Sequence, residues 1–187
     1  MTTDIVLPDK NEQTFIARAQ LLGIDRLIFL YPATPTILPQ SSHVKIVTGI
    51  LGTKGKAHLK VVRHTEHDLH IVEHDSPSIL FDLETDMRAD ALHQRASGLN
   101  HILARACAKK QVTVAFSFGL LLAANAQKRA VLLGRMMQNI RLCRKFSVPM
   151  RIASFASAPE QMRNPADIKA LFTLLGMHPK EAQQSLQ

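Results

Sequence analysis

The residues of this chain that could do chemistry are concentrated in a basic stretch without acids. Between Ala91 and Pro159 there is neither Asp nor Glu, whereas eight of the fifteen acids lie between Glu66 and Asp90. The acid-free stretch holds eleven cations: Arg95, Arg105, Lys109, Lys110, Lys128, Arg129, Arg135, Arg141, Arg144, Lys145 and Arg151. Arginine and lysine bind phosphate oxygens, and a surface of one sign attracts a polyanion. With a net charge of +8, the distribution favours a nucleic acid over an acidic protein or a membrane.

A second basic group surrounds two glycines near the middle of the chain. It consists of Lys54, Lys56, Lys60 and Arg63. A flexible basic turn of this kind could follow a phosphate backbone, and it lacks the Gly-Lys-Ser/Thr ending of a nucleotide-binding loop. A solvated turn without function is the alternative.

Arg88, His93 and Arg95 lie where the acidic segment gives way to the basic one. Arginine can bind a phosphate through two parallel hydrogen bonds, so these residues are candidates for phosphate contacts. The alternative is an ion pair with Asp86 or Asp90. Ser97 and Asn100, which follow, could bond either backbone or nucleic acid.

Four histidines and three acids near the middle of the chain are of the residue types that bind metal ions. They are His64, His67, His70 and His74, with Glu66, Asp68 and Asp75. We favour a solvated hairpin here, with His70 and His74 on one strand face and His67 in its turn. Ser117, Ser154 and Ser157 lack the glycines of a nucleophile elbow. The basic half has no pair of carboxylates for acid–base work. We therefore predict no catalytic residue and no metal site.

A long helix is predicted from Asn125, as its cap, to about Phe146. At helical spacing its core stripe is formed by Leu132, Leu133, Met136, Ile140 and Cys143. Lys128, Arg135, Arg141, Arg144 and Lys145 are expected outside this stripe, on a solvated or phosphate-binding face. Arg129 falls inside the stripe, near the start of the helix.

The remaining pattern alternates strands and helices at both ends of the chain, which predicts an α/β barrel or an open parallel sheet. Strands are predicted at residues 4–8, 26–31, 44–51, 59–63, 68–72, 78–83, 111–117 and 149–154. The other helices are predicted at residues 11–22, from Ser97 to about 106, and 166–175. Between residues 44 and 83 there is no room for crossover helices, so we expect a helix-poor region of hairpins or irregular joins there.

One domain is the default for 187 residues. We see no signal peptide and no stretch long and apolar enough to span a membrane. Cys107 and Cys143 each lie in an apolar helical pattern. We therefore interpret both as buried, reduced thiols rather than a disulfide pair.

Several short motifs, taken in order, resemble those of one protein family. The first runs from Arg88 to Asn100 (RADALHQRASGLN). It is followed by FSF at residues 116–118, Arg129, LGRM at 133–136, QN at 138–139, RLCRK at 141–145, ASFA at 153–156, RNP at 163–165 and LG at 175–176. Over residues 78–177 the sequence resembles ribonuclease P protein component 3, the thirty-kilodalton-type subunit of archaea and eukaryotes.

The resemblance implies a distorted barrel of the triosephosphate-isomerase type. This chain is shorter than the roughly 250 residues typical of that barrel. We therefore expect one shortened barrel-like domain over residues 1–187, with the helix-poor hairpin region in its middle and residues 178–187 as a polar tail.

The resemblance also implies a function, namely that of an RNA-binding subunit of ribonuclease P. That enzyme removes the 5′ leader from precursor tRNA, and its RNA carries out the chemistry. The implied partners are ribonuclease P RNA, precursor tRNA through the complex, a small ferredoxin-like subunit and other ribonuclease P proteins. The protein itself would bind no cofactor, and Mg²⁺ is expected with the RNA. The location would be the cytoplasm in an archaeon or the nucleus and nucleolus in a eukaryote, with no membrane association.

We expect RNA contacts from ten residues: Lys54, Lys56, Arg88, His93, Arg95, Arg129, Arg135, Arg144, Lys145 and Arg163. The alternative hypothesis is a metal-dependent phosphoesterase of the polymerase-and-histidinol-phosphatase superfamily, which the barrel family also resembles. That superfamily needs a His-X-His motif at the end of its first strand. Here the first predicted strand reads DIVLP at residues 4–8 and contains no histidine.

Overall fold

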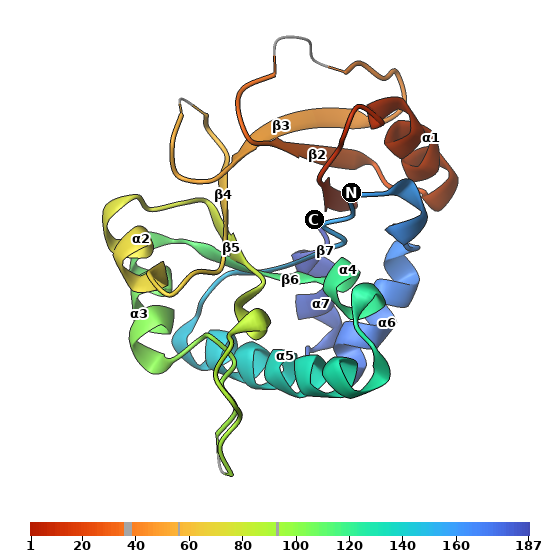
Figure 1. Ribbon diagram of the computed structural model, residues 1–187. Helices are drawn as coiled ribbons and strands as arrows, with labels where there is room; N and C mark the ends of the chain where they lie inside the picture. Colours follow the sequence, from red (N-terminus) through yellow and green to blue (C-terminus); the bar gives the residue numbers. More distant parts are fainter. Residues whose placement is uncertain (36–38, 56, 93) are drawn as a thin grey trace.

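The computed structural model describes residues 1–35, 39–55, 57–92 and 94–187, and a parallel sheet of seven strands organises it. The strands follow one another in chain order around a ring (Figure 1). Every neighbouring pair is parallel. The strands are β1 (Thr3–Val6), β2 (Arg26–Tyr31), β3 (Lys45–Leu51), β4 (Lys60–Arg63), β5 (Ile79–Phe81), β6 (Thr113–Ser117) and β7 (Met150–Ala153).

Backbone hydrogen bonds join β1 to the segment that follows β7. Phe155 N donates to Ile5 O and Leu7 N donates to Ala156 O, both at 2.8 Å. Beside them, Asp4 Oδ1 accepts from Ser154 N at 2.6 Å. Burial raises the pKa of this carboxyl. The strands therefore form a nearly closed α/β barrel, which confirms the predicted fold class.

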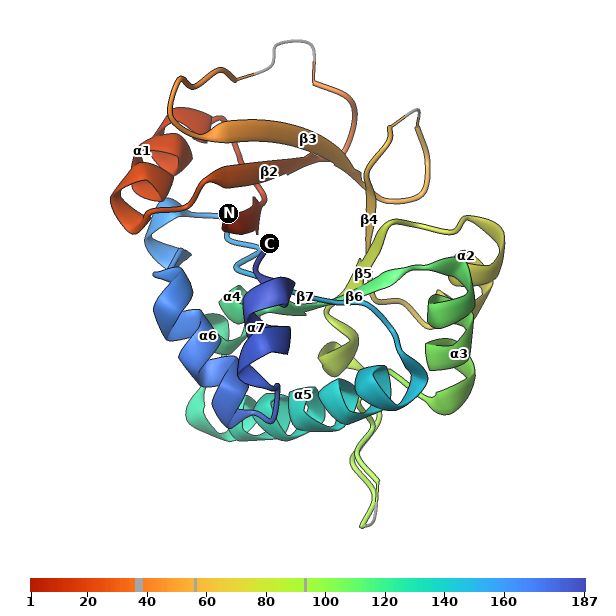
Figure 2. The same ribbon diagram turned by 180° about the vertical axis from the view of Figure 1, so that it is seen from behind.

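Helices pack around the outside of the barrel (Figures 1 and 2). They are α1 (Glu12–Leu22), α2 (Asp68–His74), α3 (His101–Lys110), α4 (Phe118–Ala123), α5 (Ala126–Phe146), α6 (Pro165–Leu174) and α7 (Pro179–Ser185). Two single turns of 3₁₀ helix, Leu83–Thr85 and Pro159–Gln161, follow β5 and β7. In the described residues, the joins from β2 to β3 and from β3 to β4 contain no helix. No helix of the described chain is long and apolar enough to cross a membrane.

Alternation along the strands divides the core into a lumen and an outer shell. The lumen cluster consists of Ile5, Ile28, Leu30, Val61, Ile79, Phe81, Ala115, Ala153 and Phe155. Across it, the rings of Phe81 and Phe155 stack with their centroids 4.1 Å apart. On each strand, the residues that alternate with the members of the lumen cluster face the helices. Side chains thus fill the barrel interior, as in other barrels of this type.

The long helix is confirmed, and so is most of its core stripe. Asn125 Oδ1 accepts from Lys128 N at 2.9 Å and caps its first turn. Leu132, Met136, Ile140 and Cys143 are buried, and Leu133 is partly buried. Both cysteines are buried and free. Burial raises the pKa of Cys107 to about 12, so the thiolate, which is the reactive form, is scarce at neutral pH.

The predicted hairpins in the middle region are wrong. β3, β4 and β5 are all parallel, and the predicted strand at residues 68–72 is helix α2. Val72 is fully buried on this helix, and Asp68 Oδ1 accepts from Thr65 N at 2.8 Å at its start. Packing and this local hydrogen bond outweigh the strand preference of a short apolar run.

The predicted polar tail at residues 178–187 is also wrong. These residues contain helix α7, whose Ala182 and the following Leu186 are 0% and 4% exposed. Thr3 N donates to Leu186 O at 2.7 Å, so the end of the helix is bonded to the first strand. The two apolar residues, one helical turn apart, are too few to give a periodic pattern. A further correction concerns α3, which begins at His101 with Asn100 as its cap rather than at Ser97.

Candidate nucleic-acid interface

Arg135 on α5 holds the segment that follows β5. Its Nε donates to Asp90 Oδ1 at 2.9 Å. Its Nη1 donates to Glu84 O at 2.9 Å and Asp86 O at 2.6 Å, and its Nη2 donates to Arg88 O at 2.7 Å. The side chain is only 8% exposed. The prediction that Arg135 projects from the core stripe to meet RNA is therefore wrong about its placement, because distant carbonyls and a carboxylate use its donors.

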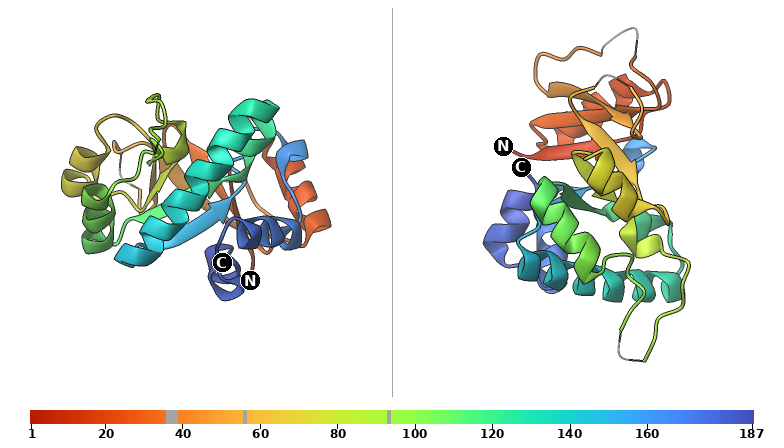
Figure 3. Two further views of the ribbon diagram at one scale, coloured as in Figure 1. Left: turned by 90° about the horizontal axis from the view of Figure 1, so that it is seen from below. Right: turned by 90° about the vertical axis from the view of Figure 1, so that its left-hand side faces the viewer.

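Two further side chains of α5 hold the other end of the same segment. Gln138 Oε1 accepts from Arg95 N at 3.1 Å, and its Nε2 donates to Arg95 O at 2.9 Å. Asn139 Nδ2 donates to Ser97 O at 2.8 Å and to Glu84 Oε1 at 2.7 Å. We call residues 86–92 and 94–97 the clasped loop, because α5 bonds both of its ends. The described parts of this loop extend beyond the barrel and α5 (Figures 1 and 3).

Gly134 allows Arg95 to lie against α5. A Cβ atom at this position would come 2.5 Å from Arg95 Cζ, closer than real contacts allow. Arg95 Nη1 in turn donates to Asp90 Oδ2 at 3.2 Å. The glycine and the two amides of α5 thus fix the position of one predicted phosphate ligand.

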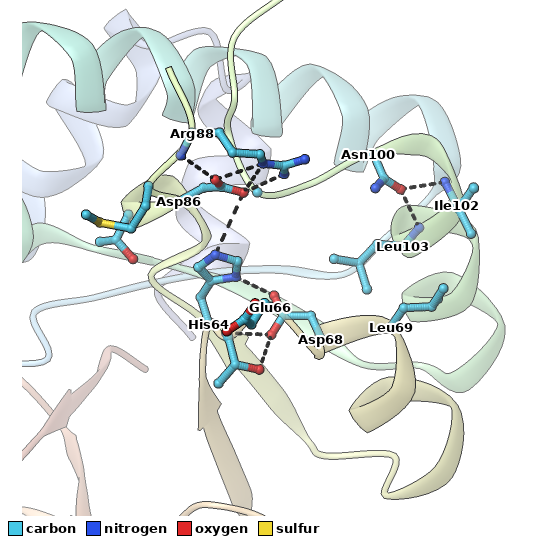
Figure 4. Close-up of a pocket in the computed structure, with 13 residues that line it drawn as sticks. His64, Glu66, Asp68, Leu69, Asp86, Arg88, Asn100, Ile102 and Leu103 are labelled. Atoms are coloured by element: carbon cyan, nitrogen blue, oxygen red, sulfur yellow. Dashed lines mark hydrogen bonds and ion pairs between the residues drawn. The ribbon is translucent and has the colours of Figure 1, made fainter. Parts of the chain in front are cut away.

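A pocket of about 820 Å³ opens between α2, α3 and the clasped loop, beside the carboxyl ends of β4 and β5 (Figure 4). His64, directly after β4, bonds Asp68 Oδ2 through Nδ1 at 2.5 Å. Its Nε2 faces Asp86 Oδ2 at 4.0 Å. The bond to Asp68 raises the pKa of His64, although burial opposes this. The apolar side chains on the lining are Leu69, Met87, Ile102 and Leu103.

Two of the three acids on the pocket lining, Asp86 and Asp68, already have protein partners. Arg88 Nη2 lies 2.5 Å from Asp86 Oδ2, and its hydrogen bonds lower the pKa of Asp86 to about 2. Asp68 bonds His64 and Thr65. Within the described ranges, no group of three or more His, Cys, Asp and Glu side chains could hold a metal ion. His70 and His74, expected on a strand, stack on α2 with ring centroids 4.1 Å apart.

A buried acidic pair that sequence reasoning did not single out follows β5. Asp82 has a left-handed backbone with φ of 63°, and its Oδ2 lies 3.1 Å from Arg63 Nε. Glu84 is fully buried, and burial raises its pKa to about 7. Glu84 Oε2 and Asn139 Oδ1 have no hydrogen-bond partner in the described structure. The sequence contained one indication of this buried polar contact. Arg135 and Asn139 lie four residues apart on the predicted long helix and therefore share one of its faces.

Several of the other predicted RNA ligands are exposed to solvent. Arg88 and Arg95 are exposed on the clasped loop and paired with Asp86 and Asp90. Lys54 is exposed beside β3. Lys145 is also exposed, with its Nζ 5.6 Å from the ring centroid of Phe146. Lys56 and His93 lie outside the described residues.

Three of the predicted ligands use their donors within the protein. Arg129 donates to Leu121 O at 2.8 Å and to Ala124 O at 2.7 Å. Arg163 donates to Glu160 O and Met162 O. Arg144 bonds Glu181 and Gly176 O. Although the sequence around Arg129 and Arg144 has no acid, folding brings carbonyls to both and a carboxylate from α7 to Arg144. RNA contacts by these residues stay a prediction.

The fold and this site define an α/β barrel with an arginine-bearing loop held by its longest helix. A sequence model of the family described as RNase P subunit p30 matches residues 40–187. The chain belongs to this family.

Individual relatives agree with the family match. The chain is 35% identical over 92 residues to ribonuclease P protein component 3 of Methanococcoides burtonii, covering 49% of this chain and 38% of that protein. It is 38% identical over 89 residues to ribonuclease P protein component 3 of Thermococcus kodakarensis, and the match covers 48% of this chain and 40% of that protein. The chain thus spans about two fifths of the length of these relatives. A longer match, to the Methanosarcina mazei protein, is 26% identical and covers 83% of this chain and 68% of that one.

Solved structures support the fold. A chain in the cryo-EM structure of archaeal ribonuclease P with mature tRNA superposes with a TM-score of 0.77 at 21% identity, covering 97% of this chain and 86% of that one. Histidinol phosphate phosphatase from Lactococcus lactis gives a TM-score of 0.59 at 10% identity, covering 95% and 94%. Both likenesses establish the barrel, and the first is the stronger.

Proposed function

We propose that this protein is an RNA-binding subunit of ribonuclease P that supports the RNA-catalysed removal of the 5′ leader from precursor tRNA. The observation that carries the proposal is the family match over residues 40–187. The likeness to a chain of archaeal ribonuclease P over 97% of this chain supports it. In this proposal the catalytic Mg²⁺ ions belong to the RNA, and the protein contributes charge and shape.

The clasped loop supplies a physical basis for RNA binding. Arg88 and Arg95 are exposed on a loop whose two ends are bonded to α5. A loop held in this way loses less conformational freedom when it binds, which favours affinity. The two arginines each retain donors that a phosphate could use beside their bonds to Asp86 and Asp90. Lys54 and Lys145 would add phosphate contacts away from the loop.

The clasped loop also carries apolar side chains that suit a protein neighbour. Met87 and Leu92 are 97% and 92% exposed. Large apolar side chains that gather on an exposed segment often mark an interaction site. We propose the small ferredoxin-like subunit as the occupant. The other proposed partners are ribonuclease P RNA, precursor tRNA through the complex and the remaining ribonuclease P proteins. The archaeal relatives favour the cytoplasm as the location.

Affinity purification from the native cell tests the proposal most directly. The tagged full chain should retain ribonuclease P RNA, identified by sequencing, together with a small protein subunit. The matched sample is a variant with Met87→Glu and Leu92→Glu, which should keep the RNA and lose the small subunit. Recovery of no enriched RNA from the unaltered chain would contradict the proposal.

A cleavage assay separates this function from the phosphoesterase alternative. We expect the isolated protein with Mg²⁺ to leave precursor tRNA intact, because the first strand, Thr3–Val6, carries no histidine. Adding ribonuclease P RNA and the partner proteins should restore 5′ cleavage. Accurate cleavage by the protein alone, abolished by His64→Ala, would instead support the phosphoesterase.

A further inference from the structure

The amino end of the barrel lumen is lined by basic residues. Arg26, Lys45 and Arg151 each lie two residues before a strand position whose side chain belongs to the lumen cluster or packs against it. Those positions are Ile28, Val47 and Ala153. Because alternate residues of a strand share one face, the three cations lie on the lumen face. Arg26 and Lys45 are direct neighbours in the register of β2 and β3.

Each of the two arginines, which are themselves half-buried, has one buried nitrogen without a partner. Arg26 Nε and Arg151 Nη1 are buried and have no hydrogen-bond partner in the described structure. Arg26 Nη2 reaches only Met1 Sδ, at 3.4 Å. The nearby Asp25 accepts from Thr2 N instead, at 2.5 Å. A buried donor without an acceptor costs free energy, so the arrangement favours an acceptor from outside the described chain.

Electrostatic repulsion between Arg26 and Arg151 further favours an external anion between them. Burial lowers the pKa of Arg151, and the charge of Arg26 lowers it further. Arginine stays protonated in proteins, so the two like charges persist beside each other. Two neighbouring cations that are partly shielded from water are stabilised when one anion contacts both. A tetrahedral oxyanion offers several acceptor oxygens to such a pair.

We propose that Arg26 and Arg151, with Lys45 at the rim, form a phosphate-binding site at the amino end of the barrel, and that an RNA backbone phosphate occupies it. The assignment of RNA as the source rests on the function proposed above. Lys45 is exposed, so the site is open enough for a polymer to reach. The site lies at the opposite end of the strands from the His64 pocket.

The described surroundings of the site supply no carboxylate to its three cations. Thr3, the neighbour of Arg26 in the register of β1 and β2, uses its Oγ1 to donate to Gln187 O at 2.6 Å. Among the described residues, no ion pair joins Arg26, Lys45 or Arg151 to a carboxylate. The two chain ends lie side by side at this end of the barrel (Figures 1 and 3).

The first experiment uses inorganic phosphate and does not depend on RNA. Melting curves of the full chain are recorded in phosphate and in chloride at matched ionic strength and pH. Phosphate should raise the Tm by roughly 2–4 °C if it binds the folded state at millimolar concentration. The Arg26→Gln/Arg151→Gln variant should lose this rise, while its Tm in chloride should be equal or higher, because an unpaired buried charge has been removed. An equal rise in wild type and variant, or none in wild type, would overturn the site.

The second experiment tests RNA as the source of the phosphate. Affinity for ribonuclease P RNA is titrated against salt for wild type, for the Arg26→Gln/Arg151→Gln variant and for a Lys109→Gln/Lys110→Gln control. The control removes the same charge from the exposed end of α3. Loss of one phosphate contact should reduce the slope of log affinity against log salt by roughly 0.7–0.9, and more than in the control.

The two experiments fail in different ways. Phosphate stabilisation that depends on the arginines, without a change in RNA affinity, would keep the oxyanion site and reject RNA as its occupant. Equal losses in the variant and in the control would reject a specific RNA contact in the same way. No RNA binding by wild type would reject the proposed function and leave the phosphate result standing. If the double variant does not fold, Arg26→Gln alone is tested in both experiments.

Discussion

At the scale of single residues, the chain uses its arginines in two different ways. Arg135 donates to one carboxylate and three carbonyls and is nearly buried. Arg88 and Arg95 lie on the surface of the loop that Arg135 fixes, and each pairs with one acid. The buried arginine is therefore structural, and it positions the exposed ones.

Replacing Arg135 should destabilise the protein. We expect Arg135→Gln to lower the free energy of unfolding by roughly 2–4 kcal/mol, because it removes several bonds from a charged donor and leaves buried carbonyls unpaired. Urea denaturation measures this change. Arg141→Gln, at an exposed position of the same helix, should stay within about 0.5 kcal/mol of wild type. Equal stability of the two variants would show that the clasp contributes nothing.

Glu84 should make stability depend on pH. Burial raises its pKa from 4.5 to about 7, so the folded state disfavours ionisation. The contribution of Glu84 to stability should therefore be most favourable below about pH 4.5, fall as the pH rises to about 7, and then level off. Over this window the ionised group costs on the order of 3 kcal/mol.

The Glu84→Gln variant isolates this effect. Its amide oxygen can still accept from Asn139, and it does not titrate. Asp4, Asp82 and His64 also have raised pKa values in the folded protein, so they give a slope of the same sign in both proteins. The difference in Tm between variant and wild type should grow between pH 5 and pH 8. A constant difference would mean that Glu84 does not titrate there.

At the scale of elements, α7 fastens the end of the described chain to the start of the barrel. Ala182 is fully buried, and Arg144 on α5 bonds Glu181 through Nη2 at 2.6 Å. Thr3 of β1 bonds both Leu186 O and Gln187 O. The helix therefore joins the longest helix to the first strand.

A charged side chain on the buried face of α7 should destabilise the protein. We expect Ala182→Glu to cost more than about 2 kcal/mol, because it places an unpaired carboxylate where no space exists. Gln184→Glu introduces the same charge at an exposed position of the same helix and should have little effect. Thermal melting of both variants decides between a docked helix and a loosely attached one.

At the scale of the whole molecule, the net charge of +8 is only partly available to a partner. Arg144 and its neighbour Lys145 are both exposed. Arg144 bonds Glu181 and Gly176 O, whereas among the described residues no carboxylate pairs with Lys145. Position in the fold, rather than charge, decides which of the two can meet a phosphate.

These two neighbours should therefore behave differently. Lys145→Gln should weaken binding to ribonuclease P RNA and reduce the slope of log affinity against log salt concentration by roughly 0.7–0.9. Its Tm should be unchanged. Arg144→Gln should lower the Tm and change the slope less, because its charge is already paired. Salt titrations and melting curves of both variants provide the measurement. Identical slopes for the two variants would argue against this division.

The sequence by itself determined the alternation of strands and helices, the long helix with its Asn125 cap, and the uneven distribution of charge. These features depend on neighbours along the chain, since caps and core stripes are local patterns. The family motifs include the residues of the clasp, Gly134, Arg135, Gln138 and Asn139, but they did not predict its contacts.

Only the tertiary structure decided which polar groups are satisfied and which are free. Arg135 meets Glu84 and Asp90 across 51 and 45 residues of chain, and no helical periodicity encodes such a contact. The short apolar run at α2 and the polar segment at α7 became helices because packing against the barrel buries Val72 and Ala182. The unpaired arginines of the barrel end come from β2 and β7, which are brought near each other because the sheet closes on itself.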